Sequence, residues 1–80
     1  MKEPRLVALK GIVIAENWGK DGRVSALGFA GYDEILYHVA DDIMGKRLRQ
    51  FVRKRLIIDG LLETTANGIT IHVKSFLLIR

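Results

Sequence analysis

The stretch Lys46–Gly60, KRLRQFVRKRLIIDG, changes its hydrophobic period midway. Apolar residues recur at helical spacing in its first half and just before it, at Met44, Leu48, Phe51 and Val52. The run Leu56–Ile58 is then continuously apolar, which is typical of a buried strand. The stretch therefore predicts a short basic helix that passes directly into a core strand.

Strand patterns lie on both sides of this helix. We predict five strands from the apolar alternation, over residues 6–15, 24–30, 34–39, 56–64 and 69–79. Turn residues separate them at Asn17–Gly22, where Asp21-Gly22 is a hairpin signal, at 31–33 and at 66–68. The helix is expected over Ile43–Val52, with the carboxylates of Asp41 and Asp42 available to cap it.

Glycines interrupt two of the predicted strands. Gly11 lies within the first and Gly60 within the fourth, and a glycine inside a strand marks a bulge or a sharp bend, as barrels need at their corners. The alternation also fails over Phe76–Ile79, where four apolar residues are consecutive. We expect there either a second bulge or a strand end that is covered on both faces.

The faces of the strands follow from the same alternation. Leu27 and Phe29 form the heavy face of the second strand, while its opposite face carries only alanine and glycine. On the third strand Tyr37 shares a face with other apolar residues, so we expect it in the core and His38 outside. On the fifth strand we expect Ile71 and Val73 inside.

The order of three strands, a helix and two strands resembles the OB-fold, a five-stranded Greek-key barrel. The resemblance covers nearly the whole chain and rests on four motifs: Leu9-x-Gly11-x-Val13, the helix end Phe51-Val52, Leu56-x-Ile58-x-Gly60 and Ile69-x-Ile71-x-Val73. It implies a mainly β fold, with the helix between strands three and four, and one domain over residues 1–80. OB-folds bind single-stranded nucleic acids, oligosaccharides or other proteins, so the resemblance implies binding without fixing the ligand.

Composition agrees with one small domain. Of the 80 residues 49% are hydrophobic, which suits a dense core, yet no apolar run approaches the roughly 18 residues of a membrane span. Cysteine is absent, which fits a reducing compartment, and the start MKEPRL lacks the apolar region of a signal peptide. We therefore expect a cytoplasmic protein. The net charge of +4 is compatible with a polyanion partner and equally with an ordinary basic surface.

The first candidate binding site combines the loop between strands one and two with two strands. As the resemblance implies, this loop borders the ligand groove, and an aromatic ring there stacks on a base for roughly 1–3 kcal/mol while cations contact phosphates. The alternative is a tryptophan that folds down over the barrel end. The residues that we assign to this site are Trp18, Lys20, Arg23, Ser25, His72 and Lys74.

A second candidate is the basic run along the helix. It consists of Lys46, Arg47, Arg49, Arg53, Lys54 and Arg55, six of the thirteen basic residues. Such a patch binds phosphates by releasing counterions, but the opposite, apolar face of the helix would also force these cations into solvent. Because the resemblance implies that this helix closes the barrel bottom, away from the usual ligand face, we rank the run second.

We expect no enzyme, metal site or cofactor. A nucleophilic triad needs a base beside serine or cysteine, and the two histidines lie on different predicted strands. The expected function is a binding module for single-stranded RNA or DNA with little sequence specificity. The alternative is a protein-interaction or assembly module without nucleic-acid binding. We expect no membrane partner, and a weak homodimer formed through Phe76–Ile79.

Overall fold

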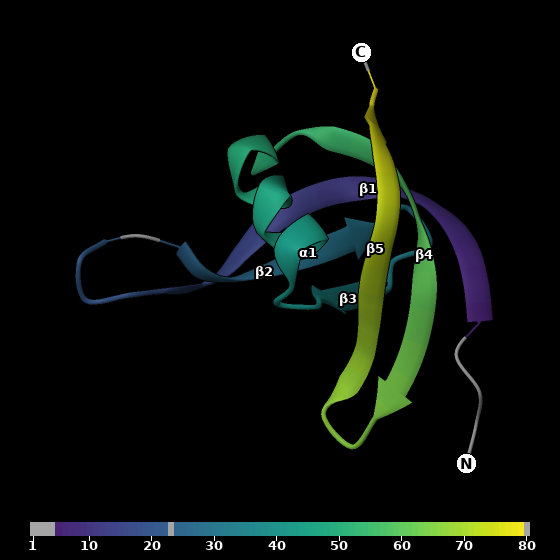
Figure 1. Ribbon diagram of the computed structural model, residues 1–80, viewed down its shortest axis with the longest axis horizontal. Helices are drawn as coiled ribbons and strands as arrows, with labels where there is room; N and C mark the ends of the chain where they lie inside the picture. Colours follow the sequence, from purple (N-terminus) through teal and green to yellow (C-terminus); the bar gives the residue numbers. More distant parts are fainter. Residues whose placement is uncertain (1–4, 23, 80) are drawn as a thin grey trace.

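Five strands close into a single barrel (Figure 1). The structure, a computed structural model, describes residues 5–22 and 24–79, and of Trp18 and Val24 only the backbone. In chain order the elements are β1 (Arg5–Trp18), β2 (Val24–Gly31), β3 (Leu36–Val39), α1 (Ile43–Arg47), the 3-10 helix η1 (Leu48–Phe51), β4 (Arg55–Thr65) and β5 (Gly68–Leu78). The prediction of a mainly β barrel of five strands, with a helix between the third and fourth, is confirmed.

Strand β1 belongs to both halves of the barrel. Its first part, Arg5–Ile12, pairs with β4, and its second part, from Gly11 to Trp18, pairs with β2, both antiparallel. The circuit is completed by β2 with β3, by β5 with β4, and by a short parallel contact between β3 and β5. The resulting order β1-β2-β3-β5-β4 is compatible with an OB-fold.

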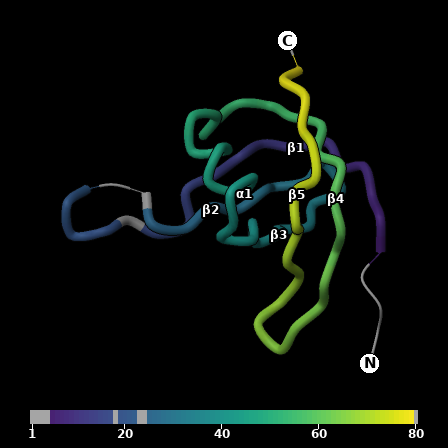
Figure 2. The backbone as a smooth tube through the Cα atoms, viewed as in Figure 1, coloured from purple at the N-terminus to yellow at the C-terminus, as the bar shows by residue number. Residues whose placement is uncertain are grey.

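Gly11 and Gly60 lie where backbones approach most closely. A Cβ atom at Gly11 would collide with the carbonyl oxygen of Ala30 on β2, and one at Gly60 with that of His72 on β5. At Gly11 the pairing with β4 continues in register, so β1 bends there without a bulge, whereas β4 and β5 change register at Gly60. Figure 2 shows the curvature of β1 and β4 around the barrel.

Two of the turns differ from the prediction: the first is shorter, and the second ends later. Asn17 and the Trp18 backbone continue β1 past a bulge, so the first turn contracts to Gly19–Gly22, where the Gly22 amide donates to the Gly19 carbonyl at 3.0 Å. β3 begins at Leu36, two residues late, because the Asp33 carboxylate accepts from the Ile35 amide at 3.0 Å and holds a turn there.

The helix is correctly placed but only half α-helical. Asp42 caps it as predicted, since its Oδ1 accepts from the Gly45 amide at 2.8 Å. After Arg47 the chain tightens into η1 and does not continue as an α-helix to Val52. The physical reason is β1: Val52 bridges Val13 with extended backbone (φ −56°, ψ 131°), and the Arg53 amide donates to the Val13 carbonyl at 2.7 Å, so the chain leaves the helix at this point.

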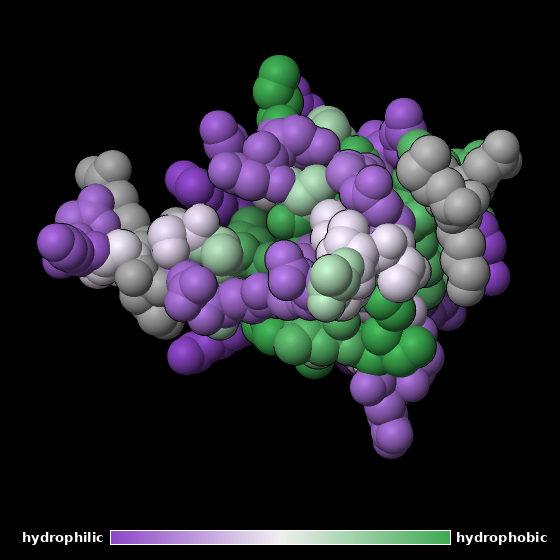
Figure 3. Space-filling model, turned by 90° about the horizontal axis from the view of Figure 1, so that it is seen from below, coloured by the Kyte–Doolittle hydropathy of each residue, from purple (hydrophilic) through white to green (hydrophobic). Residues whose placement is uncertain are grey.

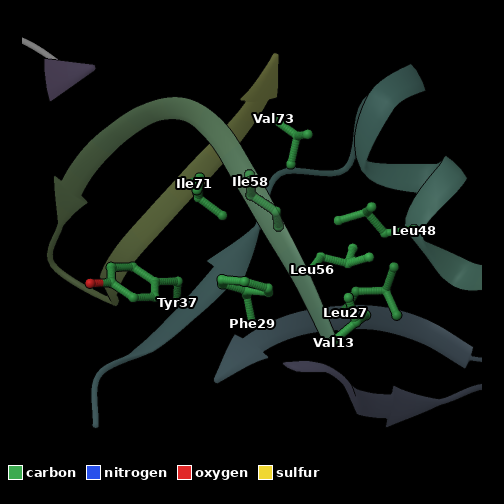
Figure 4. Packing of buried hydrophobic residues seen from close by; sticks show 9 residues of the cluster. All are labelled: Val13, Leu27, Phe29, Tyr37, Leu48, Leu56, Ile58, Ile71 and Val73. Atoms are coloured by element: carbon green, nitrogen blue, oxygen red, sulfur yellow. The ribbon is translucent and has the colours of Figure 1, made fainter. Parts of the chain in front are cut away.

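The core joins both sides of the barrel to the helix. It consists of Val13, Leu27, Phe29, Tyr37, Leu48, Leu56, Ile58, Ile71 and Val73, all at most 7% exposed (Figure 4). Leu48 extends from η1 into this cluster and closes the end of the barrel below the helix. The inward positions predicted for Tyr37, Ile71 and Val73 are confirmed.

A bulge in β5 accounts for the broken alternation near its end. Asp59 pairs with Ser75 and Gly60 with Val73, so Lys74 is an extra residue on β5. Beyond it the faces are exchanged: Phe76 lies opposite buried Ile58, packs against the core, and meets the ring of Phe51 edge-on at 5.3 Å. The second bulge, one of the two explanations offered by the sequence, is therefore observed.

Candidate functional site

The residues assigned to the first site lie on three parts of the barrel. Lys20 is exposed in the β1–β2 turn, Ser25 is exposed near the start of β2, and His72 and Lys74 lie on the outside of β5. The Trp18 side chain and Arg23 fall outside the described residues. The site thus remains a prediction, of which the structure gives the geometry of four members.

His72 and Lys74 share an open hollow of about 400 Å³ on the outside of the β4–β5 hairpin. Its walls are Asp42, Leu61, Glu63, His72, Val73 and Lys74. His72 Nε2 lies 3.1 Å from Glu63 Oε1, and both side chains are exposed. Two carboxylates therefore face the two basic residues here, which makes this hollow a poor phosphate site unless the carboxylates move away.

Ser25 opens into a different and smaller hollow, of about 60 Å³, between β2 and the helix. Its lining comes from β2, from the segment after β3 and from the helix, and consists of Ser25, Ala26, Leu27, Val39, Ala40, Asp41, Gly45, Lys46 and Arg49. Among the described residues of this lining, one hydroxyl and two cations meet, with Asp41 as the one carboxylate. Ser25 belongs to the first candidate site and Lys46 and Arg49 to the second, and the fold brings these three residues together.

The basic segment, Lys46–Arg55, is exposed at every one of its six cations. None of them forms an ion pair with any residue in the described ranges 5–22 and 24–79. The backbone beneath is fixed, because Arg53 and Lys54 hydrogen-bond to Val13 of β1 at 2.7 and 3.1 Å, and Arg53 adopts a left-handed conformation with φ 70°. A fixed backbone with unpaired cations is an arrangement that attracts polyanions.

The outer face of β2 is covered by side chains from its neighbours. Glu16 of β1 reaches across Gly28 and bonds His38 of β3, with 2.9 Å between Glu16 Oε2 and His38 Nδ1. The other ring nitrogen, Nε2, lies 3.3 Å from the Asn67 carbonyl oxygen in the β4–β5 turn. The hydrogen bond and the charge of Glu16 raise the pKa of His38 above its ordinary value.

Sequence reasoning missed this His38 network. It placed His38 on the outside of β3, but the partners Glu16 and Asn67 are 22 and 29 residues away along the chain. The one local signal was the glycine at position 28, on a strand face with unusually small residues. A bare face indicates that something approaches it closely, without saying what does.

A second polar pair stands at the other end of β3. Tyr37 points into the core, and its hydroxyl donates to Asp33 Oδ2 at 2.6 Å. Burial first, and then this hydrogen bond, raise the pKa of Tyr37 to about 12, and the same bond lowers the pKa of Asp33. The pair anchors the exposed Asp33 of the β2–β3 turn to the buried Tyr37 of the barrel.

Apolar residues are also present on the outside. The larger ones are Leu6, Tyr32, Ile35, Leu36, Ile43, Leu77 and Leu78. In the view from below, hydrophobic residues form a band beside hydrophilic ones (Figure 3). Leu77 is 67% exposed and pairs with Ile57 across β4 and β5, so it lies on the outer face as the bulge requires.

Two further properties concern metals and membranes. Within residues 5–22 and 24–79 there is no group of three His, Asp or Glu side chains that could hold a metal ion. In the same part of the chain, no helix has both the length and the apolar character needed to cross a bilayer.

Comparison of the chain with protein-family models, with curated proteins and with solved structures found no match.

Proposed function

We propose that this protein is an OB-fold module that binds single-stranded nucleic acid, RNA or DNA, with little sequence specificity. The order of the strands is compatible with that fold. The proposal includes a cytoplasmic location and no catalytic activity. The observation that carries it is the basic segment, whose six exposed cations have no carboxylate partner among the described residues.

Unpaired cations favour phosphates for a physical reason. A lysine or arginine already bonded to a carboxylate must lose that partner before it meets a phosphate, and here no such exchange is needed. Each phosphate that is neutralised releases condensed counterions, so binding is driven by entropy and weakens as salt is added. Because this contribution does not depend on the bases, it supports binding with little sequence preference.

The hollow at Ser25 supports a path from the basic segment onto β2. Lys46 and Arg49 line it from the helix, and the Ser25 hydroxyl, a donor for phosphate oxygens, lines it from β2. Lys20 is exposed in the turn that precedes the same strand. We infer that a strand of nucleic acid runs from the basic segment past Ser25 toward the β1–β2 turn, where Trp18 is the proposed stacking residue.

Fluorescence anisotropy with a labelled, mixed-sequence single strand tests this proposal. The double variant Lys46→Gln/Arg49→Gln should reduce the slope of log K against log salt by about 1.4, because each lost phosphate contact removes roughly 0.7 on single strands. Lys10→Gln, at an exposed lysine on β1, is the matched control and should leave the slope nearly unchanged. Absence of binding at low salt, or an equal effect of both variants, would refute the proposal.

A second candidate function is a protein-interaction module. The observation in its favour is the exposed end of β5, where Leu77 is 67% and Leu78 44% exposed. Retention on immobilised single-stranded DNA that decreases with salt favours the first proposal. No retention, together with a mass by light scattering above that of the monomer, favours the second.

A further inference from the structure

The imidazole of His38 lies between two hydrogen-bond acceptors from different parts of the chain. Nδ1 faces the Glu16 carboxylate, with its two oxygens at 3.0 and 2.9 Å, and Nε2 faces the Asn67 carbonyl oxygen at 3.3 Å. Glu16 belongs to β1, His38 to β3, and Asn67 to the turn between β4 and β5. One ring therefore connects three segments that are not adjacent in sequence.

Two glycines make room for this arrangement. A Cβ atom at Gly28 would collide with the Glu16 side chain in its present position, so the glycine leaves room for the path by which the carboxylate reaches His38. A Cβ atom at Gly68 would lie 3.2 Å from His38 Nε2, which is tighter than ordinary van der Waals contact, and the backbone there has φ +126°. The ring therefore lies close to the Glu16 carboxylate on its Nδ1 side and close to the Gly68 backbone on its Nε2 side.

The number of protons on the ring decides whether both contacts form. A neutral imidazole carries one N–H, so one ring nitrogen donates and the other presents a lone pair. If the proton is on Nδ1, this nitrogen donates to Glu16, but the lone pair of Nε2 faces the lone pairs of the Asn67 carbonyl oxygen. If the proton is on Nε2, this nitrogen donates to Asn67, but the lone pair of Nδ1 faces the Glu16 carboxylate. Only the imidazolium, with two N–H groups, donates to both acceptors.

We propose that His38 is a proton-dependent clamp, which holds the β4–β5 turn against β3 and β1 when the ring is protonated and releases the turn when the ring is neutral. The clamp is a property of the fold and does not depend on nucleic-acid binding. It acts on the turn because Asn67 lies at its tip, beyond the last ladder pair of the hairpin, Thr65 with Gly68.

The charged groups around His38 agree with this assignment. Glu16 faces the ring from β1, and β2, which lies between them, has no ionisable residue from Val24 to Gly31. On β3 itself, Tyr37 points inward to Asp33. On the hairpin, His72 is bonded to Glu63 across β4 and β5, and Lys74 lies two residues further along β5. Glu16 is thus the partner that favours the imidazolium, in line with the raised pKa of His38.

Nuclear magnetic resonance tests the clamp on the intact chain. Ring nitrogen shifts report the protonation of both histidines during one pH titration, and the heteronuclear NOE of residues 65–68 reports the mobility of the turn. We expect His38 to titrate above the ordinary value of histidine, and the NOE of the turn to fall as pH rises through the midpoint of His38. Glu16→Gln should shift both the midpoint and the release of the turn to lower pH.

Variants separate the clamp from general loosening of the barrel. His38→Gln should abolish the pH dependence of the turn, while His72→Gln, the matched control at the other histidine, should retain it. Methyl signals of the core residues establish that each variant is folded, and the wild-type titration decides the question without any variant. A turn whose NOE stays constant while His38 titrates would overturn the proposal, as would a midpoint of His38 at or below the ordinary histidine value of 6.5.

Discussion

At Gly11 and Gly60 the barrel has room for a hydrogen atom and nothing larger. A Cβ atom at either would collide with a backbone carbonyl oxygen of the facing strand, and a backbone atom has no rotamer by which to move away. We expect Gly11→Val and Gly60→Val each to cost about 1–3 kcal/mol of folding free energy through strain and overpacking.

Thermal melts of the two variants measure this loss. The matched control is Gly22→Asn in the β1–β2 turn. There no atom of the described residues lies within 4 Å of the Cβ position, and the φ of +80° is one that asparagine tolerates. The control should melt close to the wild type. Unchanged midpoints for both valine variants would contradict the role of these glycines as barrel corners.

The Asp33–Tyr37 pair makes stability depend on pH at the acid end. The hydrogen bond from Tyr37 lowers the pKa of Asp33 below its ordinary 3.8 in the folded state. The resulting stability is fully present above the ordinary pKa and is lost as pH falls through the lower, folded value. Urea unfolding over the acid range should show this loss in the wild type.

Asp33→Asn should flatten this part of the pH profile. Asp41→Asn, at another exposed aspartate, is the control and should keep the wild-type slope. Tyr37→Phe removes the donor without changing the core volume much, so it should also reduce the pH dependence. A steep acid profile in both Asp33→Asn and Tyr37→Phe would rule out the pair as its source.

At the scale of elements, the helix depends on its cap. Five α-helical residues are too few to be stable alone, and the element persists because Leu48 is buried and Asp42 accepts from the Gly45 amide. We expect Asp42→Ala to cost about 1 kcal/mol, as for other N-caps. Asp41→Ala, one residue earlier and without this bond, should cost much less by chemical denaturation. Equal costs would show that the cap is not the cause.

The elements were largely predictable because each has a local cause. The five strands, the helix and its Asp42 cap can be predicted from the hydrophobic period and the turn residues, because these signals lie within a few residues of the element that they specify. The end of the helix does not, because η1 arises from hydrogen bonds that β1 makes to Arg53 and Lys54, some forty positions away in the chain. The late start of β3 depends on Asp33, whose carboxylate accepts a hydrogen bond from the Ile35 amide, so this amide does not pair with a neighbouring strand.

At the scale of the whole molecule, the bulge in β5 decides which of two neighbouring apolar residues packs into the core and which is exposed. Phe76 packs inward against Phe51, and Leu77 is exposed on the outside beside Ile57. We expect Phe76→Ala to destabilise the monomer by roughly 2 kcal/mol, less than at a fully buried site, and Leu77→Ser to leave its stability nearly unchanged.

The same two variants test the weak homodimer, which stays a prediction. If Leu77 contacts a second copy, sedimentation over a range of concentrations should show a mass that rises with concentration in the wild type and not in Leu77→Ser. A monomer mass for the wild type at high concentration would exclude the dimer. It would leave the outer Leu77 as an isolated surface residue, which is common on soluble proteins.

The candidate site was less predictable than the fold, because its contacts join distant segments. The resemblance to OB-folds led to Ser25, and the run of charges led to the basic segment. The hollow that unites Ser25 with Lys46 and Arg49 exists only once β2 and the helix are placed together. His38 is the clearer case, since its two partners become neighbours only when the barrel closes. The sequence can show which residue types are present, but which of them are neighbours is decided only when the barrel closes.

The closure of the barrel is itself uneven. β4 and β5 are joined by ten residue pairs, but β3 meets β5 through two pairs, at His38 and Val39. Heat or force should therefore separate β3 from β5 first and convert the cylinder into a curved open sheet, with the antiparallel ladders still intact. His38 lies in this narrow seam. If the clamp that we propose operates, protonation of its ring would also favour the closed barrel over an open sheet with two free edges.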